Sequence, residues 1–338
     1  MPEPWIVGRI PMLDRTIPVV STTLSRADVI GGWKVRWDIG RKSYTVPPGL
    51  FAVGKPTVDS PVLVTANYKL TFDRLRKELA GIDAWILVLD TKGINVWCAA
   101  GKGTFGTREL VLRMNEARLD QVVRHKTLIL PQLGAPGVSA PAVKKATGWR
   151  VVYGPVRARD IPAFLANGMK KDERMRTVEF RLADRMAIAS VEFAHSWPIL
   201  LAMLAVSIPF ALPFGAGYGA RLLRVFLPLA GSVVVATLAF PALLPYLPFR
   251  AFSLKGAVLG ILWGVASSLA AEASLPGAAA MTLTTAPIVS FLAMNFTGSS
   301  TFTCQTGAER EVRRGAIPMA ASLLLGVGGS VAARIIGV

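Results

Sequence analysis

One stretch of the sequence decides how the residues around it are arranged: Gly93-Ile94-Asn95-Val96-Trp97-Cys98-Ala99-Ala100-Gly101-Lys102-Gly103-Thr104-Phe105-Gly106-Thr107. It follows an apolar run at residues 84–90, which is typical of a buried parallel strand. It precedes a helical pattern over residues 107–119. Because ligands bind at the carboxyl ends of strands in doubly wound sheets, Cys98 falls where a ligand is expected.

Within this stretch, the residues between the glycines predict a one-turn helix. Asn95 is suited to N-capping, and the residues that follow it favour a helix. Asn95 and Cys98 are three positions apart, so both side chains are expected on one face, with the amide able to donate a hydrogen bond to the sulfur. The alternative is a buried structural cysteine, since free cysteines are among the most buried residues.

Eight of these residues, Asn95-Val96-Trp97-Cys98-Ala99-Ala100-Gly101-Lys102, are similar to the signature of the mercury-methylating corrinoid protein family (HgcA). Residues 62–153 also resemble the corrinoid domain of the corrinoid iron-sulfur protein of acetyl-CoA synthesis. The resemblance implies a cap helix whose eight residues lie against a corrinoid. It also implies that Cys98 is the lower axial ligand of the cobalt and that Asn95 tunes the sulfur.

A second loop at a predicted strand end is a candidate for contacts with the same cofactor. It reads Thr65-Ala66-Asn67-Tyr68-Lys69-Leu70-Thr71 and follows an apolar run at residues 61–65. Neighbouring parallel strands end at the same edge of a sheet, which brings this loop close to Cys98. The candidate contacts are Thr65, Ala66, Asn67 and Thr71, and the resemblance places Thr65 and Thr71 beside the corrin. For Thr71, simple capping of the next helix is the alternative.

A third loop, Pro131-Gln132-Leu133-Gly134-Ala135-Pro136-Gly137-Val138, follows an apolar run at residues 127–130. Glycines let backbone amides approach a ligand closely. The same composition is also ordinary turn chemistry, so the motif is weak by itself. Its place at a third strand end makes four residues candidate cofactor contacts: Leu133, Gly134, Ala135 and Gly137.

Periodicity predicts an α/β Rossmann-like domain with a parallel sheet of about five strands. The predicted strands are at residues 50–53, 61–65, 84–90, 127–130 and 149–153. The alternating run at residues 33–39 predicts an additional edge strand, and Thr71 is expected to cap a helix over residues 71–80.

The second half of the chain predicts an all-α transmembrane domain. The 338 residues are 52% hydrophobic, and the apolar excess lies after His195. A span needs about 20 apolar residues. About five are expected, at residues 197–217, 222–244, 252–271, 275–296 and 316–336.

These patterns predict a cytoplasmic corrinoid-binding domain at residues 1–169, with its core at about 50–169, a basic juxtamembrane linker at 170–195, and a transmembrane domain at 196–338. The formal charge is +17, and basic residues crowd before the first span, which marks the cytoplasmic side. The expected location is therefore the cytoplasmic membrane. A nucleic-acid partner is not expected, because no basic stripe with interleaved aromatics appears.

The chain holds two cysteines, Cys98 and Cys304, which are too few for an iron-sulfur cluster site. The resemblance therefore implies a ferredoxin-like iron-sulfur partner of the HgcB type as electron donor and possible Hg(II) carrier. The Asp-x-His-x-x-Gly motif that supplies a histidine ligand to many cobalamin enzymes is absent. Cys98 is then the candidate soft metal ligand in the first half of the chain. Cys304 lies in a polar stretch and is a candidate transient Hg(II) ligand, with an incidental cysteine as the alternative.

The resemblance implies corrinoid-dependent methyl transfer to Hg(II), forming methylmercury, with a cysteine thiolate below the cobalt. The resemblance implies a methyl-pterin as the source of the methyl group. Two alternatives stay open: a corrinoid methyl carrier of one-carbon metabolism that does not act on mercury, and a membrane transporter with a regulatory soluble domain.

Overall fold

We analysed a computed structural model, which describes residues 3–12, 14–213, 215–296, 302 and 305–336. The chain forms two compact units. The first comprises Met1–Val35 with Ile39–Val178, and the second comprises Arg36–Asp38 with Glu179–Val338. Cys304 and most of the polar stretch around it lie outside the described residues.

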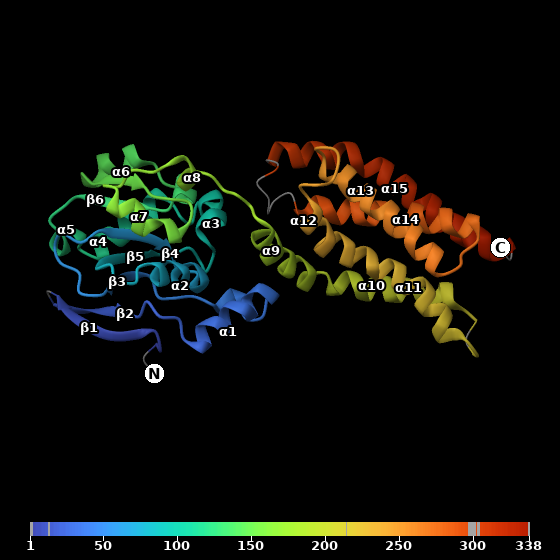
Figure 1. Cartoon of the computed structure of the whole chain (residues 1–338), viewed down its shortest axis with the longest axis horizontal. Coiled ribbons are helices and arrows are strands. Elements are labelled where there is room, and N and C mark those ends of the chain that lie inside the picture. The colour runs from blue at the N-terminus through green and yellow to red at the C-terminus, as the bar shows by residue number, and fades with distance from the viewer. Residues whose placement is uncertain (1–2, 13, 214, 297–301, 303–304, 337–338) are drawn as a thin grey trace. The chain divides into compact units, whose positions relative to one another are not determined.

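The first unit is built on a seven-stranded sheet with the order β1-β2-β3-β5-β4-β6-β7 (Figure 1). The strands are β1 Ile6–Met12, β2 Arg15–Val20, β3 Gly49–Val53, β4 Val62–Ala66, β5 Ala84–Leu89, β6 Thr127–Leu130 and β7 Arg150–Tyr153. β5, β4, β6 and β7 run parallel to one another, as predicted for the core. β1 and β2 form an antiparallel pair, which the sequence reading did not predict.

β3 is antiparallel to β5, so the expectation of an all-parallel sheet is wrong at this strand. A parallel crossover takes about a dozen residues or more, and only residues 54–61 join β3 to β4. The chain must therefore reverse. It does so at Gly54, which adopts a φ of +66°, while the Asp83 carboxylate accepts a hydrogen bond from the Lys55 amide at 2.8 Å.

Helices cover both faces of the sheet, giving three layers. The helices are α1 Arg26–Lys34, α2 Lys69–Glu78, α3 Val96–Lys102, α4 Thr107–Glu116, α5 Leu119–Val122, α6 Ala140–Thr147, α7 Ile161–Ala166 and α8 Glu173–Arg176. On β5, Trp85 and Leu87 pack with α3, α4 and α6, whereas Ile86 and Val88 pack with α2 and α7. A strand buried on both faces explains the continuous apolar run in the sequence.

Two local predictions before and after β3 are wrong. Residues 33–39 do not form a strand: they comprise the end of α1, a short 3₁₀ helix, Val35–Trp37, and a turn at residues 38–39. A capping box starts α1 upstream of these residues. The Asp28 amide donates to the Ser25 hydroxyl, and the Ser25 amide donates to the Asp28 carboxylate. Thr71 does not cap a helix either. α2 begins two residues earlier, at Lys69, whose amide donates to the Tyr44 carbonyl.

The second unit is helical. Its helices are α9 Leu182–His195, α10 Trp197–Ala211, α11 Tyr218–Val234, a π-helical turn Val235–Ala239, α12 Phe240–Leu243, α13 Phe252–Ala270, α14 Leu275–Asn295 and α15 Gln305–Ile336. Among the residues that the structure describes, four helical stretches are long and apolar enough to cross a membrane, and α9 with α10, bent by 48°, raises the number to five if the pair is one span. The expected number of about five is compatible with this range.

Small residues let the long helices of this unit pack closely. A Cβ built on Gly260 of α13 would lie 2.6 Å from the Cα of Ala286 on α14. A Cβ on Gly326 of α15 would lie 2.7 Å from the amide of Thr284. Glycine thus allows these apolar helices to approach each other at backbone distance.

Candidate functional site

The predicted cap helix is present as α3, with fixed ends. The Asn95 Oδ1 atom accepts a hydrogen bond from the Cys98 amide at 3.0 Å, which caps the helix start. The helix ends at Gly103, whose φ of +79° is the left-handed conformation that glycine adopts without strain. The amides of Thr104 and Phe105 then donate to the Ala99 carbonyl.

The two faces of α3 differ sharply. Val96, Ala99 and Ala100 are buried in the hydrophobic core. Trp97 and Cys98 lie on the opposite, exposed face. The alternative of a buried structural cysteine is therefore wrong.

The surface next to Cys98 is open. Gly101, three residues after Cys98 and on the same exposed side, would place a Cβ with nothing within 4 Å. Lys102 is exposed beside it. α3 thus presents a thiol next to bare backbone, which is a surface that a flat ligand can approach.

Asn95 bonds to the backbone amide of Cys98 rather than to the sulfur. Because the Asn95 Oδ1 atom caps the start of α3, this side chain stabilises the turn that carries the Cys98 thiol. The predicted role of Asn95 toward the sulfur stays a prediction.

Asn67, one of the expected cofactor contacts, is buried and bonded within the protein. Its Oδ1 atom accepts hydrogen bonds from the Thr91 amide at 3.1 Å, the Thr91 hydroxyl at 2.8 Å and the Gly93 amide at 3.0 Å. Its Nδ2 atom donates to Asp90 at 3.2 Å. Asn67 therefore ties the end of β4 to the loop that leads into α3. Sequence reasoning missed Thr91, although its place directly after β5 is the signal that marks it.

The loop between β5 and α3 is also held by charge. Asp90 pairs with Lys92, and its backbone amide donates to Glu109 at 2.8 Å. Although burial of the carboxyl acts in the opposite direction, the hydrogen bonds and charge of Lys92 lower the pKa of Asp90. Asp90 thus remains ionised and able to accept from Asn67.

Replacing Asn67 with alanine removes all four of these bonds and leaves buried polar groups unsatisfied. Each such group costs about 1–3 kcal/mol, so we expect the loop before α3 to open. Hydrogen exchange should speed up mainly at residues 91–98. Asn115→Ala, at an exposed position of α4, is the control and should leave exchange there unchanged. Equal loss of protection over the whole sheet would show that Asn67 is merely structural.

The other three candidate contacts of the second loop, Thr65, Ala66 and Thr71, do not share one face of the fold. Thr65 is buried within β4 and, because side chains alternate along a strand, shares the sheet face of Leu63. Ala66 lies on the other face, the one that also packs α3. Thr71 is half-buried in the first turn of α2.

The third loop, residues 131–138, packs against the buried side of α3 and the residues that follow it. A Cβ on Gly137 would lie 2.0 Å from the Phe105 carbonyl oxygen and 2.9 Å from the Cα of Ala100, and one on Gly134 would lie 2.6 Å from the Phe105 ring. The amides of Gly134, Ala135 and Gly137 bond to carbonyls of their own loop. These glycines therefore permit close packing against the cap helix. Contacts of Leu133, Gly134, Ala135 and Gly137 with a cofactor stay predictions.

Gly137→Ala should displace α3 because the new methyl group has no space. We expect a loss of about 1–3 kcal/mol in the free energy of unfolding, measured by denaturant titration. Gly101→Ala is the matched control on the open face of α3, where a helical alanine is favourable by about 0.5–1 kcal/mol. A Gly137→Ala variant as stable as Gly101→Ala would contradict the packing argument.

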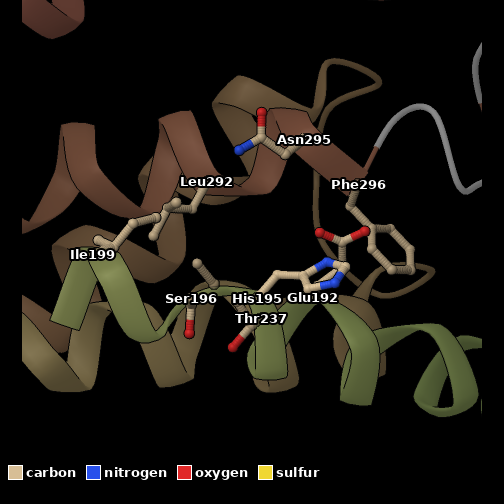
Figure 2. Close-up of a pocket in the computed structure, with 9 residues that line it drawn as sticks. Glu192, His195, Ser196, Ile199, Thr237, Leu292, Asn295 and Phe296 are labelled. Atoms are coloured by element: carbon tan, nitrogen blue, oxygen red, sulfur yellow. The ribbon is translucent and has the colours of Figure 1, made fainter. Parts of the chain in front are cut away.

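The second unit has a pocket with both polar and apolar lining residues at the bend between α9 and α10 (Figure 2). Its lining includes Glu192, His195, Thr237 and Asn295. The His195 Nε2 atom lies 2.8 Å from a carboxylate oxygen of Asp38, which belongs to the same unit. Among the described residues, no three His, Cys, Asp or Glu side chains cluster as a metal site.

Comparison with known proteins finds relatives for part of the first unit. Residues 38–165 match the family model described as CO dehydrogenase/acetyl-CoA synthase delta subunit. The corrinoid/iron-sulfur protein large subunit of Moorella thermoacetica is 33% identical over 114 residues, which are 33% of this chain and 25% of that protein. The first unit thus contains a domain like those of corrinoid/iron-sulfur proteins.

Two archaeal relatives match the corrinoid-protein-like domain as well. The acetyl-CoA decarbonylase/synthase complex subunit gamma of Methanopyrus kandleri is 35% identical over 127 residues, 37% of this chain and 27% of that subunit. The same subunit of Archaeoglobus fulgidus is 33% identical over 127 residues, with the same coverage. The chain thus spans about a quarter of the length of these relatives. The family match begins at residue 38, so β1, β2 and α1 lie outside it.

Proposed function

We propose that the first unit binds a corrinoid on the exposed face of α3, with Cys98 as the lower axial ligand of its cobalt, and that the chain transfers a methyl group to Hg(II). The observation that carries this proposal is the exposed thiol of Cys98, held on a capped turn beside open backbone in a corrinoid-protein-like domain. Thiolate is a soft donor that suits cobalt.

The residues around Cys98 fit a flat macrocycle. Gly101 leaves the outer face of α3 free of a side chain where the ring would lie, and the half-exposed Trp97 adds an aromatic surface. The buried face of α3 is anchored in the core, so the thiol is held in place before a ligand arrives. Asn95 restrains the first turn, and Asn67 restrains the loop before it.

The corrinoid would supply a methyl group bound to cobalt. Because Hg(II) is an electrophile, the methyl group must reach it with its bonding electrons or as a radical. The Cys98 thiolate would hold the metal and would donate electron density to it, which would favour that direction of transfer. Asn95 would tune this donation if its amide turns toward the sulfur.

The proposed reaction would need partner proteins for electron transfer and for methyl supply. Two cysteines cannot hold a four-cysteine iron-sulfur cluster, so reduction of the metal after transfer would need an external electron donor. A ferredoxin-like protein of the HgcB type fits this role and is a possible Hg(II) carrier. A methyl-pterin-dependent system is the proposed methyl source. Cys304 remains a proposed transient Hg(II) ligand.

The second unit is proposed to lie in the cytoplasmic membrane with the corrinoid-protein-like domain on the cytoplasmic side. With five spans, Arg250 falls in the connection before α13, and Arg310, Arg313 and Arg314 lie in the first turns of α15, so all four would be on the same side as the N-terminus. An excess of basic residues in short connections marks the cytoplasmic face.

The relatives favour a second candidate, a corrinoid methyl carrier of one-carbon metabolism that does not act on mercury. Their names place them in acetyl-CoA decarbonylase/synthase complexes. One assay separates the two candidates: purified chain, corrinoid, a low-potential reductant and a methyl donor, with and without Hg(II). Methylmercury formed in proportion to enzyme supports mercury methylation. A cofactor that takes up methyl groups but forms no methylmercury supports the carrier.

A further inference from the structure

Helix α1 of the first unit turns apolar side chains outward and small or charged ones inward. The side that faces the domain carries Asp28, Gly31 and Gly32, spaced by three and four residues. The outer side carries Val29, Ile30 and Trp33, which are 60%, 53% and 58% exposed. An ordinary surface helix does the opposite and buries its apolar stripe.

Buried charge explains why the helix is turned this way. Asp28 lies 2.5 Å from the Lys69 ammonium and 2.9 Å from the Arg76 guanidinium, and all three side chains are buried. A Cβ on Gly31 would lie 2.7 Å from the Tyr44 hydroxyl, so only a small residue fits on the inner side. The ion pairs and the tight contact fix the rotation of α1, which leaves its apolar residues outward.

The outer face of α1 is bordered by positive charge. Within residues 26–35 of the first unit, the basic side chains are Arg26 and Lys34, and the one acidic side chain, Asp28, is buried in ion pairs. Arg26 and Lys34, at the two ends of α1, are exposed. Apolar residues with a tryptophan, flanked by lysine and arginine, are the composition that lies in the headgroup region of anionic membranes.

We propose that α1 is a membrane-docking helix, with Val29, Ile30 and Trp33 inserted at the headgroup boundary of an anionic bilayer and Arg26 and Lys34 against lipid phosphates. The proposal rests on the membrane placement of the second unit, which keeps the first unit tethered at a lipid surface. α1 lies outside the family match, so the helix is an addition to the corrinoid-protein-like domain.

The test uses the full chain in nanodiscs that contain anionic and nitroxide-labelled lipids. In a background with Cys98→Ser and Cys304→Ser, Ile30→Cys carries an environment-sensitive fluorophore. Leu112→Cys is the matched control, because Leu112 is also an apolar side chain on a helix surface and is 46% exposed. Nitroxide lipids should quench the label at residue 30 at least about twofold more than the label at residue 112, and iodide should quench it less. Co-elution with the nanodisc tests the membrane placement separately.

A label at residue 30 that iodide quenches as strongly as the label at residue 112 would show a solvated face and overturn the proposal. Shielding from both iodide and nitroxide lipids would show that protein covers α1, which also overturns it. Reversing the flanking charges, Arg26→Glu with Lys34→Glu, should lower lipid quenching on anionic discs. Unchanged quenching would contradict the role of charge. The measurement needs neither corrinoid nor methyl transfer, so it is independent of the proposed reaction.

Discussion

Replacing Cys98 with alanine is expected to abolish methylmercury formation, because the variant lacks the thiolate that the proposed reaction needs opposite the methyl group. Loss of the metal ligand should also change the optical spectrum of the corrinoid-loaded protein. The apo fold should persist, because Cys98 is exposed and its backbone amide still donates to Asn95. The measurements are a mercury methylation assay and the spectrum before and after the substitution.

Cys98→His is the informative companion variant. Histidine restores a metal ligand but supplies a nitrogen donor in place of sulfur. If the electron donation of the thiolate matters, this variant should bind corrinoid and still form little methylmercury. A Cys98→Ala variant that methylates Hg(II) at the rate of the unaltered chain would refute the proposed role of the thiolate.

Replacing Arg76 with glutamine should destabilise the first unit strongly. Arg76 is fully buried and lies 2.9 Å from Asp28 and 2.8 Å from Asp73, and its NH1 group also donates to the carbonyl of Thr23 at 3.1 Å. Removing one partner from a buried ion-pair network costs about 3–5 kcal/mol, because the remaining charges stay buried. Denaturant unfolding measures the loss.

Arg74→Gln is the matched control for Arg76, since Arg74 is exposed on the same helix. It should change the free energy of unfolding by no more than about 0.5 kcal/mol. Equal effects of the two substitutions would contradict the importance of the network. Loss of the network should also release α1, so lipid quenching at residue 30 should fall in the Arg76 variant.

The same network predicts a dependence of stability on pH. Burial alone would raise the pKa of Asp28, but the hydrogen bond and charge of Lys69, together with the bonds from Ser25, hold that pKa far below its usual range. The folded state therefore binds the Asp28 proton more weakly than the unfolded state. This contribution to stability is present above the unfolded pKa of about 3.9 and is lost as the pH falls below it. Unfolding measured from pH 6 to pH 3 should show the loss, and a network variant should show less of it.

The core of the first unit could be predicted from the sequence because its signals are local. The strand ends at Leu89 and Leu130 agree with their apolar runs, and α3 begins after Asn95 because the capping side chain is part of the same turn. The eight-residue signature around Cys98 was likewise readable without a fold, because its residues are consecutive in the chain. The helical second half followed from hydropathy, which needs no tertiary contact.

Only the tertiary structure decided the features that join distant residues. Asn67 and Gly93 are 26 positions apart, and their bond appears only when β4 and β5 end side by side. The direction of β3 and the rotation of α1 likewise depend on long-range contacts: the pairing with β5 and the ion pairs from Asp28 to Lys69 and Arg76. The sequence by itself determined where the thiol is and what surrounds it along the chain. The tertiary structure decided what holds the thiol in place, because hydrogen bonds and buried charges between separated segments leave no local pattern.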